Sequence, residues 1–352
     1  MAIVKRGTRY YAVVIHNGRQ VWRAGGTSER SAKKVEAELV SQIARGEYRE
    51  LKRATFNQFQ KMWWTDYASV HLKRSTQDEY ALYVRKHLAP YFGGSQMKAI
   101  SPQFIQRYVT LKLDSGLAPK SVRNHLVVLS SIFHRAVAWD YVATNPMSKD
   151  RVEWPKKPYA AVRYLSVEEV QRLLAATDLT WRTIFLTEVM TGLRMGEIRA
   201  LRWGDIDFEL GRIHVAQDLY KNEADTLKSE KSRRTIPVSP RLLSALFDRK
   251  LDAPASAMDL VFCKPDGAPI TPYSIRAALK KALTAAGLER IRFHDLRKTF
   301  STVLVQLGEN PKVVQELLGH ADVNLTMSIY TAAMPDTKVS AIGRLESAFF
   351  DD

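Results

Sequence analysis

The stretch Thr191-Gly192-Leu193-Arg194-Met195-Gly196-Glu197 is the most informative part of this 352-residue chain. Helix-forming sequence runs up to Thr191-Gly192, and glycine is the usual residue at a helix end. Arg194 follows this boundary, and Glu197 comes one helical turn later. The start of a helix favours anions. An arginine on its own is most often a surface salt-bridge partner, so the meaning of Arg194 depends on what accompanies it.

Further residues of the same chemical kind follow downstream. They are Lys228, the run His294-Asp295-Leu296-Arg297, the run Leu317-Leu318-Gly319-His320, and Tyr330, which comes ten residues after His320. Two arginines, a lysine and two histidines can surround one phosphate, and a tyrosine beside them can attack it. The set therefore predicts breakage and rejoining of a phosphodiester through a covalent tyrosine link.

The chemistry of the phosphodiester explains why these residue types are needed. Attack builds charge on oxygens that are already negative, so catalysis requires fixed cations, a nucleophile and an acid for the leaving oxygen. Arg194 and Arg297 suit the first task, because a guanidinium reaches two oxygens and stays charged. Lys228 lies between strand-like runs and is a candidate acid, with Lys221 and Lys231 as rivals nearby.

The same residues also have ordinary structural interpretations. A single histidine is more often structural than catalytic, and most of the 14 tyrosines are expected to be packed in cores. Glu197 is expected to orient a neighbouring histidine or arginine rather than to take part in the chemistry. It is the combination of residues that favours a catalytic site.

These boxes, in this order and spacing, resemble the signature of the tyrosine recombinases, in particular the phage-type integrases. The resemblance covers the region from Thr191 to Tyr330 strongly, the helical region before it well, and the N-terminal part only through its hairpin and helix. It implies a mainly helical fold with small β-sheets: a sheet-plus-helix N-terminal domain, a helical-bundle core-binding domain and a mixed α/β catalytic domain.

The resemblance also implies a role for each site residue. Tyr330 is the nucleophile that forms a 3′-phosphotyrosyl intermediate, and Lys228 is the general acid. Arg194 and Arg297 clamp the phosphate, His294 and His320 support it and the proton transfer, and Glu197 is the acidic residue of the first box. No cofactor or metal is expected. The expected function is site-specific recombination that integrates or excises a mobile element such as a phage genome.

Partners and location follow from the same resemblance and from charge. The expected partner is double-stranded DNA at core sites and arm sites, bound by a homotetramer with an accessory bending or directionality factor. Lys and Arg number 53 against 37 Asp and Glu, a net charge of +16 that attracts polyanions. No apolar run reaches the length of a membrane span, so we expect a cytoplasmic, nucleoid-associated protein with no membrane partner.

Four segments are predicted along the chain. Residues 1–53 hold 12 Lys and Arg against 5 Glu, with an Asn17-Gly18 hairpin turn and a helix capped by Thr27 or Ser28, and they are interpreted as an arm-type DNA-binding domain. Residues 54–148 read as four short helices, the second stopping at Pro90, and form the core-binding domain. Residues 149–163 are expected to be a linker and residues 164–352 the catalytic domain with a C-terminal tail.

Three other functions stay open on the sequence alone. A tyrosine-type DNA topoisomerase would use the same chemistry without exchanging strands between two sites. A catalytically silent DNA-binding protein would have the same charge. A metal-dependent nuclease would use His294, Asp295, His320 and Asp322, and excess chelator would abolish its activity.

Overall fold

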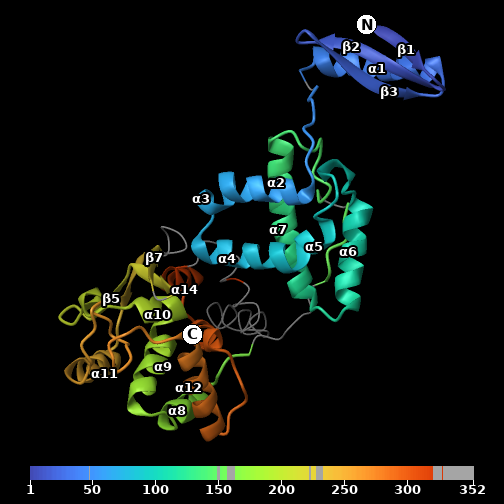
Figure 1. The fold of residues 1–352 in the computed structure, drawn as a ribbon. Helices are drawn as coiled ribbons and strands as arrows, with labels where there is room; N and C mark the ends of the chain where they lie inside the picture. Colours follow the sequence, from blue (N-terminus) through green and yellow to red (C-terminus); the bar gives the residue numbers. More distant parts are fainter. Residues whose placement is uncertain are drawn as a thin grey trace, which may run out of the picture. The chain divides into compact units, whose positions relative to one another are not determined.

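The chain separates into two units, Met1–Tyr159 and Ala160–Asp352, each with its own core. The computed structural model describes residues 1–46, 48–148, 151–156, 163–221, 223–226, 233–319 and 327. Helices dominate, and the sheets are small and antiparallel (Figure 1). This arrangement confirms the predicted fold class.

A three-stranded sheet with one helix forms the start of the first unit (Figure 1). The strands are β1 (Ala2–Arg6), β2 (Arg9–His16) and β3 (Arg19–Gly26), and the helix is α1 (Glu29–Ala44). Asn17 and Gly18 both have positive φ, 49° and 75°, as the predicted two-residue hairpin turn requires. Ser28 caps α1 by accepting the Ser31 N–H. Strand β1 was not predicted, because five residues at the chain start give too short a pattern.

The remainder of the first unit is a helical bundle. Its elements are α2 (Phe56–Trp63), a π-helical turn (Trp64–Ala68), α3 (Ser69–His71), α4 (Arg74–Tyr83), a second π-helical turn (Val84–Leu88), α5 (Ala89–Phe92), a 3₁₀ turn (Met97–Ala99), α6 (Pro102–Asp114) and α7 (Pro119–Ala138). The predicted caps at Ser101 and Pro102 and the apolar stripe of α7 are present. The bundle core is apolar and rich in aromatic rings.

One detail of the bundle prediction is wrong. The second helix does not stop at Pro90 but continues to Phe92. The reason lies in the π-helical turn Val84–Leu88, which widens the helix immediately before the proline. Pro90 then occupies the first turn of α5, where its missing N–H and its ring are tolerated.

Part of the predicted linker packs against the bundle. Val152 and Pro155 are buried, and the Glu153 N–H donates to Gln106 Oε1 at 2.8 Å. The Arg123 guanidinium donates to the Pro155 carbonyl at 2.9 Å and lies over the Trp154 ring. Residues 151–156 are therefore held on the bundle by specific contacts.

The second unit is built around a main apolar core, with two smaller buried apolar clusters beside it. Its helices are α8 (Val167–Ala175), α9 (Leu179–Thr191), α10 (Met195–Ala200), α11 (Pro240–Leu251), α12 (Pro272–Ala285), α13 (Phe293–Gln306) and α14 (Pro311–Leu318), with a 3₁₀ turn (Trp203–Asp205). The strands β4 (Ile206–Asp207), β5 (Arg212–Val215) and β8 (Arg234–Pro237) form one antiparallel sheet, and β6 (Gln217–Tyr220) pairs with β7 (Glu223–Thr226). The predicted capping box at Ser166 is present.

The bundle contains one buried polar cluster. Tyr108 Oη and His125 Nδ1 are 2.9 Å apart, and the His125 ring stacks on that of His87 with 4.2 Å between centroids. Burial, with smaller contributions from the charges of His87 and Lys112, lowers the pKa of His125 to about 4. His125 is thus a neutral residue of the core.

Acid is expected to destabilise the protein through this cluster. Because the pKa of His125 is lower in the folded state, the unfolded chain takes up a proton first as pH falls below the ordinary value of 6.5. Stability should decline between pH 6.5 and 4, by up to about 3 kcal/mol. Urea unfolding followed by tryptophan fluorescence should show a flatter pH dependence for His125→Gln. The same change at His134, an exposed position of α7, should leave the wild-type slope.

Candidate active site

Four of the seven predicted site residues are in the described part of the chain. They are Arg194, Glu197, His294 and Arg297. Lys228, His320 and Tyr330 lie outside the described residues. The described part of the predicted site thus comprises both arginines, the glutamate and one histidine.

Two glycines shape the segment that carries Arg194. Gly192 ends α9 in the left-handed conformation with φ 63°, and a Cβ there would lie 2.5 Å from the Phe300 ring of α13. At Gly196, a Cβ would meet the Asp218 carboxylate of β6 at 1.6 Å. Glycine at these two positions lets α13 and β6 approach the turn between α9 and α10, which brings Arg194 to the junction of all four elements.

Glu197 joins two arginines inside this junction. The Arg194 Nη1 donates to Glu197 Oε1 at 2.6 Å, and the Arg234 Nη2 donates to Glu197 Oε2 at 2.8 Å. Only 1% of the Glu197 side chain is exposed. Burial alone would raise the pKa of Glu197, but the Arg234 hydrogen bond and the charges of Arg234 and Arg194 outweigh it and lower that pKa to about 2. Glu197 is therefore a permanent anion between two cations.

Arg297 reaches the same place from α13. Its guanidinium donates to the Gly192 carbonyl and, at 2.6 Å, to the Leu318 carbonyl. Burial lowers the pKa of Arg297, and the nearby charge of Arg194 lowers it further, although a guanidinium remains protonated at neutral pH. Within the part of the chain that the structure describes, this guanidinium binds carbonyl groups and makes no direct ion pair with a carboxylate.

Three arginines donate hydrogen bonds to carbonyl groups at the C-terminal end of α14. Arg234 Nε donates to the Leu317 carbonyl at 2.7 Å, Arg297 Nη2 to that of Leu318, and Arg194 Nη2 to that of Gly319 at 3.3 Å. The last carbonyls of a helix lack intrahelical partners and lie at the negative end of its dipole, so they suit cations. The N-cap residue of α10 and residues of β8 and α13 thus meet at the carbonyl groups of residues 317–319.

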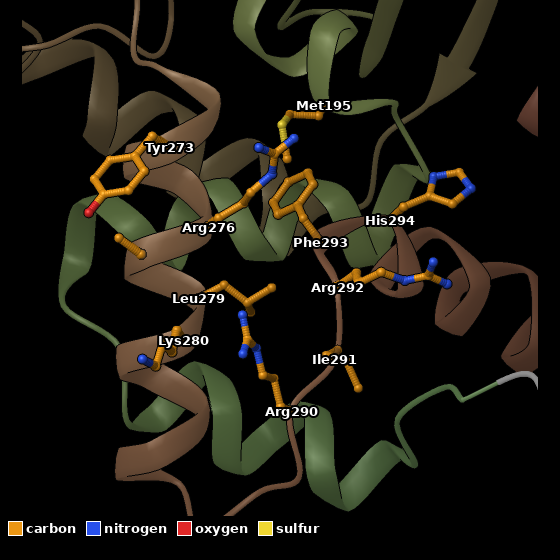
Figure 2. Close-up of a pocket in the computed structure, with 11 residues that line it drawn as sticks. Met195, Tyr273, Arg276, Leu279, Lys280, Arg290, Ile291, Arg292, Phe293 and His294 are labelled. Carbon is orange, nitrogen blue, oxygen red and sulfur yellow. The ribbon is translucent and has the colours of Figure 1, made fainter. Parts of the chain in front are cut away.

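His294 begins α13 beside a basic pocket. The pocket has a volume of about 690 Å³, and Figure 2 shows its walls, formed by α12 on one side and residues 290–294 on the other. Desolvation lowers the pKa of His294, and the charges of Arg297 and Lys298 lower it further, so the imidazole is neutral at physiological pH. The cationic residues that line the pocket are Arg276, Lys280, Arg290 and Arg292.

Asp295 has a structural position. Its buried carboxylate pairs with Arg292 at 3.1 Å and with Lys298 at 2.8 Å. Burial acts to raise the pKa of Asp295, but hydrogen bonds from Arg292 and Lys298 outweigh it and lower that pKa to about 2. With its oxygens engaged by two cations, Asp295 is poorly placed to serve as the metal ligand of the nuclease alternative.

Two residues at this junction were not predicted from the sequence. One is Arg234, which pairs with Glu197. The other is Glu188 of α9, which is fully buried and interacts electrostatically with Arg297. A signal for Arg234 existed, because it is two residues before the apolar Ile236 and therefore on the buried face of the strand. Glu188 gave none, since a single glutamate in a helix usually faces solvent.

Comparison with known proteins identifies the family. Residues 163–336 match the model described as "Phage integrase family", and residues 55–112 match "Phage integrase, N-terminal SAM-like domain". A tyrosine recombinase XerC-like protein of Caldanaerobacter subterraneus is 26% identical, with 98% of each chain covered. Tyrosine recombinase XerD of Listeria innocua is 30% identical over 61% of this chain and 72% of its own length.

Solved structures support the same fold. The Tn1549 transposon integrase, in complex with transposon right end DNA, has a TM-score of 0.74 at 20% identity, with 83% of this chain and 99% of that chain covered. A lambda integrase tetramer bound to a Holliday junction has a TM-score of 0.63 at 18% identity, with 92% of each chain covered. The chain belongs to the phage integrase family of tyrosine recombinases. It is a site-specific DNA recombinase, an enzyme that cleaves and rejoins DNA.

Loss of the Glu197 charge should destabilise the second unit. Glu197→Gln would leave Arg194, Arg234 and Arg297 close together without their shared anion, at an expected cost of about 2 to 4 kcal/mol. Thermal unfolding would measure it. Glu209→Gln, on an exposed turn, is the matched control and should change stability little. Equal melting temperatures for the two variants would contradict the structural role of Glu197.

Proposed function

We propose that the junction of Arg194, Glu197 and Arg297 is the phosphate-binding half of the recombinase active site. The observation that carries this proposal is the convergence of Arg194 and Arg297 on the last carbonyls of α14. Arg194 has 27% of its side chain exposed and is the more open of the two. A guanidinium has five N–H donors, so each arginine keeps donors for phosphate oxygens beyond those it uses here.

The proposed reaction is a phosphoryl transfer in line. The Tyr330 phenolic oxygen bonds to phosphorus while the bond from phosphorus to the 5′ oxygen breaks. Lys228 gives a proton to that 5′ oxygen, and His294 or His320 takes the phenolic proton. Neutral His294 is able to accept a proton or to donate a hydrogen bond to the phosphate. Attack by the 5′ hydroxyl of another strand reverses these steps and reseals the DNA.

The arginines supply the electrostatic part of catalysis. Charge grows on the non-bridging oxygens during attack, and Arg194 and Arg297 are positioned before the reaction, so little reorganisation is needed. Glu197 fixes Arg194 and Arg234 without facing the phosphate. Because the phosphotyrosyl bond keeps the energy of the cleaved bond, resealing needs no nucleotide hydrolysis.

The rest of the chain would deliver DNA to this site. We assign residues 54–148 to core-site binding and residues 1–53, with their surplus of basic side chains, to arm-site binding. The lambda and Tn1549 integrases are DNA-bound in their structures, and the lambda protein is tetrameric on a Holliday junction. By analogy, this chain would act as a homotetramer on a mobile element or phage genome, with an accessory bending or directionality factor, in the bacterial cytoplasm.

Among the described residues, none of the helices could span a bilayer.

Substitution of the nucleophile gives the direct test. Tyr330→Phe should keep DNA binding and lose covalent protein–DNA complexes on a nicked suicide substrate, because phenylalanine has no oxygen to attack phosphorus. Tyr273→Phe is the control, since Tyr273 is 81% exposed at the basic pocket and should remain dispensable. A covalent product that persists in Tyr330→Phe would refute this role. Peptide mapping of the wild-type adduct identifies the attached residue and base.

Deletion of residues 1–53 tests the division of labour. The truncated protein should cleave core sites as the full chain does but bind arm-type sequences more weakly, since it loses 12 basic residues. Gel shifts on the two kinds of DNA measure this. Unchanged affinity for both would show that the segment has another role.

Mixing two DNA sites separates a recombinase of this kind from a topoisomerase. Strand exchange between the sites is the expected product. Relaxation of supercoils without exchanged products would favour the topoisomerase.

A further inference from the structure

Glu188 is a buried acid without an obvious structural purpose. It is fully buried in α9, one helical turn before Gly192. Neither carboxylate oxygen makes a hydrogen bond of ordinary geometry among the described residues, although the backbone N–H of Arg297 lies close enough to act against the rise in its pKa. Burial of such a group is costly, and unpaired buried polar atoms are rare enough to require an explanation.

Its surroundings connect Glu188 to Arg297. Helix α9 packs against α13, which carries Arg297. The Glu188 backbone carbonyl accepts the Gly192 N–H at 2.8 Å, and the Gly192 carbonyl accepts the Arg297 guanidinium. Two hydrogen bonds therefore link the backbone of one residue to the side chain of the other.

The charge balance around Glu188 follows from this geometry. Burial raises the pKa of Glu188 well above its ordinary range, and the charge of Arg297, which acts in the opposite direction, offsets only part of that rise. The Glu197 anion raises it further. The neutral form of Glu188 therefore persists to higher pH than that of an ordinary glutamate.

The other charged groups near Glu188 and Arg297 belong to the helices and strands packed around them. Arg194 is the N-cap residue of α10, Glu197 lies within α10, and Arg234 belongs to β8. Helices α8 and α11 also pack against α9. Their charged side chains are at least partly open to solvent: Glu168, Glu169, Arg172, Arg241, Asp248, Arg249 and Lys250.

We propose that Glu188 is a positioning residue that acts on the DNA phosphate through Arg297. When the Glu188 carboxyl group ionises, it attracts the Arg297 guanidinium and so weakens the attraction between Arg297 and the phosphate. While Glu188 is neutral, the Arg297 guanidinium has its full charge available to the phosphate. When Glu188 loses its proton, an anion forms inside the protein, where charges interact more strongly than in water. Part of the attraction that Arg297 exerts on the phosphate is then lost. This inference rests on the proposed role of Arg297.

The variant Glu188→Gln removes the ionisation of the side chain and keeps its shape. Glutamine has the same shape as the neutral acid and never ionises, so it should fold at least as well as the wild type. The control is Thr187→Val at the neighbouring position. Thr187 is also fully buried in α9, and its hydroxyl donates at 2.7 Å to the Thr183 carbonyl of the same helix.

Stability against pH tests the titration itself. The pKa of Glu188 is higher in the folded state, so the folded wild type loses stability as pH rises above the ordinary glutamate value. The melting temperature of Glu188→Gln should therefore exceed that of the wild type by a margin that grows between pH 5 and 9. A constant margin, as expected for Thr187→Val, would contradict the proposal.

Cleavage against pH tests the effect on Arg297. The rate of single-turnover cleavage of the nicked suicide substrate should be similar for Glu188→Gln and the wild type at pH 6. The ratio of their rates should rise by about threefold towards pH 9, a change of about 0.7 kcal/mol in transition-state stabilisation. The ratio for Thr187→Val should not change with pH. Parallel pH profiles for Glu188→Gln and the wild type would overturn the positioning role.

A separate variant distinguishes this proposal from the proposed function. Arg297→Lys should cleave far more slowly than the wild type, because lysine lacks the planar pair of donors. Wild-type cleavage by Arg297→Lys would refute the phosphate role of Arg297. Slow cleavage by Arg297→Lys together with parallel profiles for Glu188→Gln would leave that role intact and refute only the role of Glu188.

Discussion

The buried carboxylate of Glu197 is the interaction on which the described part of the site depends. It pairs with Arg194 and Arg234 and keeps its charge because the pKa is lowered to about 2. Without this anion, the guanidinium groups of Arg194, Arg234 and Arg297 would repel one another within the same small volume. One acidic side chain therefore allows a cluster of cations to be assembled before any DNA arrives.

Carbonyl groups, together with Glu197, fix the positions of the three guanidinium groups. The end of α14 gives one carbonyl each to Arg234, Arg297 and Arg194. A carbonyl orients a guanidinium but carries no net charge, so the positive charge remains available to an incoming phosphate. The cluster is thus positioned by its surroundings and keeps a net positive charge, because Glu197 is one anion beside three guanidinium groups.

Local sequence and tertiary packing are consistent with each other at this junction. Gly192 and Gly196 are small where α13 and β6 come close, and the helix caps predicted at Ser28, Ser101 and Ser166 are all present. The departures have physical causes. A π-helical turn lets the second bundle helix continue past Pro90, and contacts with Gln106 and Arg123 hold residues 151–156 on the bundle.

The sequence by itself determined the helices, their caps, the fold class and the resemblance to the tyrosine recombinases, because these depend on short-range patterns and on the order of motifs. The tertiary structure alone decided which charges meet. Strand alternation favours the buried face for Arg234 but does not identify its partner, and Glu188 resembles any helical glutamate. Folding pairs Arg234 with Glu197, and it buries Glu188 where the charge of Arg297 acts on it. Burial and pairing depend on segments distant along the chain, and these determine the energy of a charge inside a protein.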